Sequence, residues 1–71
     1  MTPATIYYGS AASLRREIGL AECYQCKWQI VPYGKNGEEF TPDGFSSKSE
    51  MMFQIADYQS AYPDAEFVFH Y

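Results

Sequence analysis

The spacing of apolar side chains alternates between two periods along the chain, and the order of these changes constrains the fold. Residues 4–8 have the β-branched and aromatic content of a short strand, and Gly9 is expected to end it. Ser10 can cap a helix that runs to about Ile18, because its hydroxyl can accept an unpaired amide of the first turn. Gly19 then follows at the position where a left-handed helix C-cap is expected.

Residues 22–33 change to a period of two, which predicts a strand with one buried face. Asn36-Gly37 suits the two positive-φ positions of a type I′ hairpin turn, so residues 38–41 are the expected return strand. Trp28 is expected in the core. Pro32 cannot donate to a ladder of hydrogen bonds, so we expect it at a sheet edge or at a bulge.

The second predicted helix has clear signals at both of its ends. Ser47 and Glu50 have the spacing of a capping box, in which each side chain pairs with a backbone amide at a helix start. Pro63 cannot continue a helix, which places the end near Tyr62. Residues 65–71 return to a period of two, with Phe67, Phe69 and Tyr71 on one face.

The predicted element order is therefore β-α-β-β-α-β in one domain of residues 1–71. This order is that of the ferredoxin-like split βαβ arrangement, an α+β sandwich of two layers with a mostly antiparallel sheet. That topology makes the third strand central, although residues 38–41 are short and polar. The alternative is a three-stranded ββαβ core with a loose N-terminal segment.

Charge disfavours some partners and favours others. Five basic and nine acidic residues give a net charge of −4, which disfavours direct binding to nucleic acid. Residues 1–35 carry four basic and two acidic residues, a net charge of +2, whereas residues 36–71 carry one basic and seven acidic residues, a net charge of −6. Such asymmetry is typical of an acidic face that meets a basic partner, or of a solvated surface.

Membrane and export signals are absent from the sequence pattern. The longest clean apolar runs have three residues, far below the roughly 20 that a spanning helix needs. No basic segment followed by an apolar stretch opens the chain, so we expect a cytoplasmic protein without membrane contact.

Cys23 and Cys26 form a C-x-x-C motif, which can bind a metal or exchange electrons on a suitable turn. A structural zinc site needs four ligands, and the chain has neither a second such pair nor a second histidine beside His70. We therefore interpret the cysteines as reduced, buried apolar residues. The alternative is a redox pair, or a zinc site shared by two chains.

Catalytic signals are missing as well. His70 is next to last in the chain, and no nucleophile, metallohydrolase or phosphate-loop motif occurs. The carboxylates show no spaced pair for glycosidase-type acid–base work. We expect neither an enzyme nor a bound cofactor.

The most informative feature is the number of large aromatic residues: seven Tyr, five Phe and one Trp in 71 residues. Such side chains are favoured at protein interfaces. By the 100° rule, Phe53 lies opposite the buried arc of the second helix, near Asp57. The candidate interface residues are Phe53, Asp57, Tyr58, Glu38 and Glu39.

The pattern as a whole favours a small non-enzymatic protein-binding module, such as an inhibitor, adaptor or regulator. In size and acidity the chain resembles small accessory proteins of phages and mobile elements, which often act by occluding a host protein. One alternative is an acidic nucleic-acid mimic that blocks a basic groove; the other is a metal-bridged or redox protein using Cys23 and Cys26. Self-association as a homodimer is also expected if an edge strand such as residues 22–33 pairs with its copy.

Overall fold

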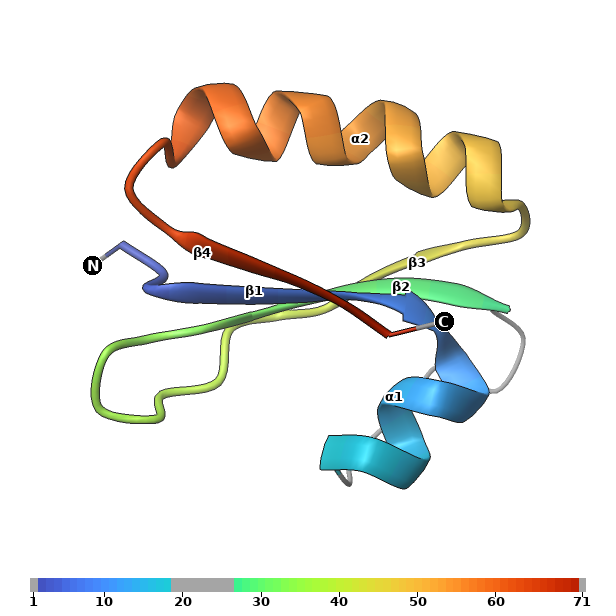
Figure 1. Cartoon of the computed structure of the whole chain (residues 1–71), viewed down its shortest axis with the longest axis horizontal. Coiled ribbons are helices and arrows are strands. Elements are labelled where there is room, and N and C mark those ends of the chain that lie inside the picture. The colour runs from blue at the N-terminus through green and yellow to red at the C-terminus, as the bar shows by residue number, and fades with distance from the viewer. Residues whose placement is uncertain (1, 19–26, 71) are drawn as a thin grey trace.

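The computed structural model describes residues 2–18 and 27–70. They form a four-stranded mixed sheet with two helices (Figure 1). The elements in chain order are β1 (Thr5–Ser10), α1 (Ala11–Ile18), β2 (Trp28–Tyr33), β3 (Asp43–Phe45), α2 (Lys48–Ala61) and β4 (Glu66–His70). The predicted α+β class and the β-α-β-β-α-β order are confirmed.

The strands are arranged in the order β3-β2-β1-β4. β1 pairs antiparallel with β2 and parallel with β4, and β2 pairs antiparallel with β3. The ferredoxin-like arrangement places the third strand between the first two, whereas β1 and β2 are neighbours here. The predicted strand order is therefore wrong. The alternative with a loose N-terminal segment is also wrong, because β1 is an interior strand.

α1 is short compared with the strand before it, and it is only one part of the connection between β1 and β2. A parallel crossover must carry the chain back along the whole preceding strand. An eight-residue helix spans about 12 Å, whereas the six-residue strand before it spans about 20 Å. β1 runs directly into α1, and β2 then returns antiparallel beside β1.

The two helices cover opposite faces of the sheet (Figure 1). The expectation of a two-layer sandwich is therefore wrong. On the α2 side, Ile6 and Ile30 pack with residues of the helix in the larger core cluster. On the α1 side, Leu14 packs with Val31 in a smaller cluster. The period of two along β1 and β2 makes both clusters possible, because successive residues point to opposite faces.

Gly9 lies inside β1 and does not end it. Its backbone approaches the last residue of β4 so closely that a Cβ atom would lie 1.8 Å from the carbonyl oxygen of His70. The φ angle of Gly9 is +152°, which side-chain-bearing residues rarely adopt. A glycine is therefore required for β4 to pair with β1 at this end.

The hairpin after β2 differs from the predicted type I′ turn. Gly37 has a φ of 86°, but no side-chain-bearing residue of the described ranges has a positive φ, which excludes the turn predicted for Asn36. Gly37 N–H donates to Gly34 C=O at 3.1 Å, and Gly34 N–H donates to Glu38 C=O at 2.7 Å. These bonds define a three-residue loop, a type I turn followed by a glycine bulge.

The return strand is also displaced from its predicted position. Residues 38–41 contribute only an isolated bridge between Tyr33 and Glu39, whereas β3 pairs further along the chain. The displacement places Phe45 opposite Trp28, and both half-buried rings pack against the larger core cluster. β3 is an edge strand, which removes the conflict of a short polar strand at the centre of the sheet.

Pro32 lies in β2, which is an interior strand and not the expected edge. The register of β3 reaches only to Ile30, so Pro32 lies beyond the end of that strand. Its carbonyl accepts the N–H of Phe40 at 3.2 Å, and the backbone nitrogen of a strand residue points to the same side as its carbonyl. The missing N–H therefore does not interrupt the pairing of β2 with β1.

Ser10 and Ser47 cap their helices as predicted, whereas the Glu50 carboxylate bonds to serine hydroxyls and not to the backbone amide expected in a capping box. Ser10 Oγ accepts the N–H of Ser13 at 3.2 Å, and Ser47 Oγ accepts the N–H of Glu50 at 3.2 Å. The Glu50 carboxylate accepts hydroxyl hydrogen bonds from Ser46 and Ser47. α2 ends one residue before its C-cap Tyr62, in agreement with the effect of the following proline. The predicted cap at Gly19 lies outside the described residues.

Candidate functional site

The outward face of α2 carries the most exposed large apolar side chain of the described residues. Phe53 is 77% exposed. Asp57 lies one helical turn further on the same face, and it is exposed too. Met51 and Ile55 are buried against the sheet, which directs Phe53 away from it. The predicted exposure of Phe53 is confirmed, while its role in partner binding stays a prediction.

Tyr58 was predicted as part of the same interface, but it lies on the other side of α2. It is half-buried, packs against the larger core cluster, and its hydroxyl donates to the carboxylate of Asp43 in β3. Burial, this hydrogen bond and the charge of Asp43 hold the pKa of Tyr58 above its ordinary value of 10.0. Tyr58 therefore fastens α2 to the sheet edge at β3.

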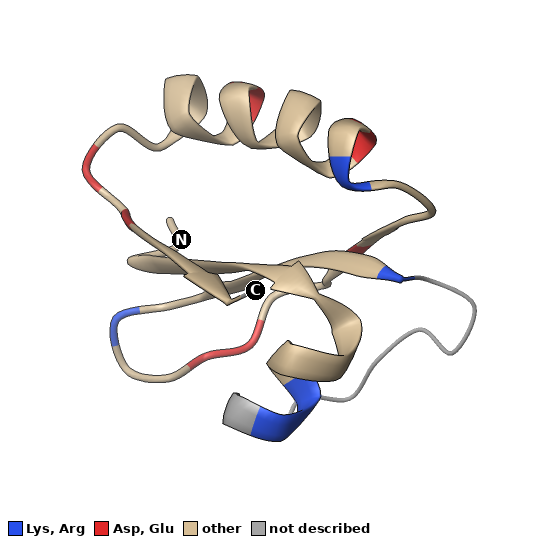
Figure 2. Ribbon diagram, turned by 45° about the vertical axis from the view of Figure 1, so that its right-hand side comes forward, with Lys and Arg blue, Asp and Glu red and all other residues tan. Residues whose placement is uncertain are grey.

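Glu38 and Glu39 lie in the hairpin connection, which projects on the side of the sheet opposite α2 (Figures 1 and 2). The Glu38 carboxylate accepts the N–H of Asn36 at 2.8 Å and so closes the hairpin loop. Glu39 is exposed. The five residues predicted from the sequence thus do not form one surface, and only Phe53 and Asp57 share a face.

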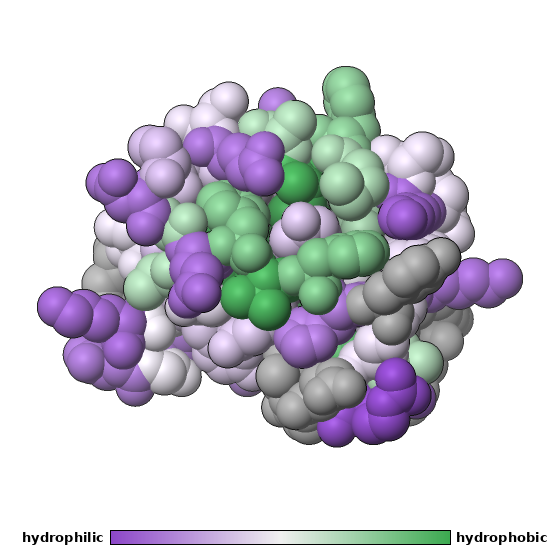
Figure 3. Space-filling model, in the orientation of Figure 1, coloured by the Kyte–Doolittle hydropathy of each residue, from purple (hydrophilic) through white to green (hydrophobic). Residues whose placement is uncertain are grey.

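A second exposed apolar region, not predicted from the sequence, lies between α2 and β4. Met52 is 41% exposed and Phe69 is 39% exposed. Lys48 Nζ lies 5.6 Å from the centroid of the Phe69 ring, a distance that permits a cation–π interaction, and Met52 follows Lys48 by one helical turn. Figure 3 shows apolar side chains gathered over this face, with hydrophilic side chains around them.

The sequence pattern grouped Phe69 with Phe67 on one face but did not show how far this face is covered, because period two alone does not identify an edge strand. α2 contacts the three other strands of the sheet. β4, one of the two edge strands, is left less covered. The position of Met52 on the flank of the helix was the available sequence signal. The surface that Met52 borders depended on the tertiary structure.

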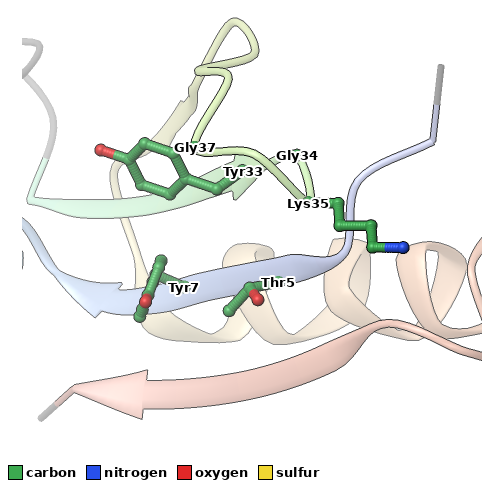
Figure 4. A pocket seen from close by; sticks show the side chains of 6 residues that line it. All are labelled: Thr5, Tyr7, Tyr33, Gly34, Lys35 and Gly37. Atoms are coloured by element: carbon green, nitrogen blue, oxygen red, sulfur yellow. The ribbon is translucent and has the colours of Figure 1, made fainter.

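The α1 side of the sheet contains a hollow of about 360 Å³ at the hairpin end (Figure 4). Its lining consists of Thr5, Tyr7, Tyr33, Gly34, Lys35 and Gly37. The rings of Tyr7 and Tyr33 meet edge to face with centroids 5.6 Å apart, and the Lys35 side chain extends away from them (Figure 4). The lining offers hydroxyl groups and one ammonium group.

This hollow lacks the groups that activate a nucleophile. Burial, followed by the charges of Glu39 and Tyr7, raises the pKa of Tyr33, so its hydroxyl stays protonated at neutral pH. The lining holds no carboxylate, imidazole or thiol. The imidazole of His70 instead stacks at a tilt on Tyr7, with centroids 5.8 Å apart. The hollow can receive a small polar group but has no acid–base pair.

Metal binding has no support within the described part of the chain. Residues 2–18 and 27–70 contain no group of three His, Cys, Asp or Glu side chains placed to hold one ion. Cys23 and Cys26 lie outside the described residues, so the C-x-x-C hypothesis stays a prediction.

Comparisons with protein-family models, curated proteins and solved structures found no match to the chain. Neither α1 nor α2 is long and apolar enough to cross a membrane. The exposed face of α2 around Phe53 is the candidate site.

Proposed function

We propose that this chain is a small non-enzymatic protein-binding module that docks the outward face of α2 on a partner protein. The observation that carries the proposal is the 77% exposure of Phe53. An aromatic side chain left in water on a rigid helix is a typical interface anchor. The helix is rigid because Ser47 caps it and Met51 and Ile55 hold it against the sheet.

The charges on α2 indicate which kind of partner would fit. Asp57 lies one turn from Phe53, and Glu50 lies one turn before it near the helix start. Figure 2 shows both acidic positions on the helix, with a single basic position at its start. The partner that fits is a cytoplasmic protein with an apolar pocket bordered by basic side chains. The module would act on it as an inhibitor, adaptor or regulator.

The first test is an affinity pull-down from nuclease-treated source-cell lysate. The tagged wild type is compared with Phe53→Ala/Asp57→Ala and with Thr41→Ala, a matched exposed substitution in the connection between β2 and β3. We expect a stoichiometric partner with the wild type and with Thr41→Ala but not with the double variant. Truncating an aromatic anchor costs about 2 kcal/mol or more, which corresponds to binding weaker by roughly 30-fold.

Substitution of exposed residues separates loss of binding from loss of folding. Phe53→Ala should change the free energy of unfolding by no more than about 0.5 kcal/mol. A partner retained by the double variant would contradict the proposal. If that partner were also released by moderate salt, a nucleic-acid mimic would be favoured, because binding would then depend on many carboxylates.

A further inference from the structure

β4 is an edge strand with few of the features that protect such strands. It pairs with β1 on one side, and no strand of residues 2–18 and 27–70 flanks its other side. Natural edge strands are commonly guarded by lysine, proline or a bulge, because unpaired backbone groups invite another strand. Residues 66–70 contain neither lysine, arginine nor proline. The open edge of β4 is therefore suited to pairing.

The backbone groups on the open edge can be identified from the pairing with β1. The N–H of Glu66 donates to the carbonyl of Ala4 at 2.9 Å, so the backbone groups of Glu66 face β1. The backbone groups of successive strand residues point to alternate sides, so those of Val68 and His70 face β1 as well. The N–H and C=O groups of Phe67 and Phe69 consequently point to the open side.

We infer that β4 pairs antiparallel with β4 of a second copy of this chain, about a two-fold axis through Val68. In this register Phe67 lies opposite the partner's Phe69. Residues directly opposite each other in such a hydrogen-bonded pair exchange two backbone bonds. The symmetry repeats the pair, so the two N–H and two C=O groups of Phe67 and Phe69 in each copy all form hydrogen bonds across the axis. The result is a continuous eight-stranded sheet.

Side chains across this pairing are complementary. Glu66 lies opposite the partner's His70, which places a carboxylate acceptor beside an imidazole donor on both sides of the axis. Shifting the axis to Phe67 would place Glu66 opposite the partner's Val68 and remove this match. The self-complementarity favours a second copy over a partner of different sequence.

The same pairing covers the apolar region between α2 and β4. Ile6, which is opposite Phe67 in the sheet, faces α2, so Phe67 and Phe69 lie on the α2 face. A two-fold axis perpendicular to the sheet keeps the α2 faces of both copies on one side. The aromatic rings of the two β4 strands then form a seam flanked by two copies of α2, and the exposed Met52 of each copy lies one helical turn from Lys48, which contacts Phe69.

The test is the oligomeric state of the full chain, measured by sedimentation equilibrium over a concentration series. We expect the wild type to dimerise and His70→Glu to weaken dimerisation by about tenfold, because it places carboxylates opposite each other twice. Adding Glu66→Arg to His70→Glu should restore the dimer. Asp57→Arg, a matched charge reversal on the outward face of α2, should leave it unchanged.

Amide hydrogen exchange of the wild type gives a second test that needs no variant. Protection of the amides of Phe67 and Phe69 should rise with protein concentration, whereas those of Glu66 and Val68 should be protected throughout. A wild type that stays monomeric up to millimolar concentration would overturn the inference. The inference would also be overturned if Glu66→Arg/His70→Glu failed to dimerise although its circular dichroism is native. The same holds if the protection of the Phe67 and Phe69 amides did not depend on concentration. Phe53→Ala separates this inference from the proposed function, because it should leave the dimer unchanged.

Discussion

Replacing Gly9 by alanine should strongly destabilise the fold, because β4 leaves no room for a Cβ atom at this position. The new atom would lie 1.8 Å from the carbonyl oxygen and 2.7 Å from the carbonyl carbon of His70. Both are backbone atoms, so relief requires β4 to move away from β1. The φ of +152° adds strain for any residue with a Cβ.

The expected cost can be worked from these two effects. Backbone strain and the disrupted end of the β1–β4 ladder together give about 3 kcal/mol. A chain of this length has a free energy of unfolding of roughly 4–10 kcal/mol, so a large part of it would be lost. Urea unfolding followed by circular dichroism measures the change, and the melting temperature should fall by more than about 10 °C.

Gly37→Ala is the matched control for this prediction. Gly37 also has a positive φ, of +86°, but a Cβ added there would meet no atom within 4 Å. It should cost only about 1 kcal/mol of backbone strain. Both substitutions restrict the unfolded chain equally, so their difference isolates the contact with β4. Equal losses of stability in the two variants would refute the close approach of β1 and β4.

Three further predictions address the core, the α2–β3 contact and the cysteines. Ile55→Ala should lower the free energy of unfolding by about 2–5 kcal/mol in urea titrations, because it leaves a cavity in the larger core cluster; a loss below about 1 kcal/mol would contradict that packing. The raised pKa of Tyr58 means that the folded state keeps a proton that the unfolded state releases above pH 10, so stability should fall as pH rises beyond that value. Tyr58→Phe should flatten this dependence, and an unchanged slope would exclude the hydrogen bond to Asp43 as its cause. Intact-mass analysis of the purified protein should show no metal. Zinc at one ion per two chains, lost in Cys23→Ser/Cys26→Ser, would instead support a zinc site shared by two chains.

Local signals were sufficient where a few neighbouring residues decide the structure. Ser47 and Pro63 bound α2 to within one residue, because capping and the loss of a donor act within a single turn. The helical spacing also separated buried Met51 and Ile55 from exposed Phe53. The glycine at position 37 marked a positive φ, although the turn built around it was of a different type.

Local signals were insufficient where the structure depends on a distant strand. Residues 38–41 and Asp43–Phe45 both follow the hairpin, and only the second segment brings an aromatic ring opposite Trp28. Gly9 resembles a strand breaker until the carbonyl of His70 is placed beside it. The hydrogen bond from Tyr58 to Asp43, which fastens α2 to the sheet edge, could not be predicted from the helix alone.

The sequence by itself determined the number, type and order of the elements, since propensity, capping and periodicity are encoded within a few residues. Only the tertiary structure decided which strands are neighbours, and therefore that β1 is interior and β4 is an edge. Strand pairing joins residues far apart in the chain and depends on which arrangement buries the most apolar surface. The candidate site divides in the same way: exposure of Phe53 follows from the helical period, whereas the open edge of β4 exists only once the sheet is assembled.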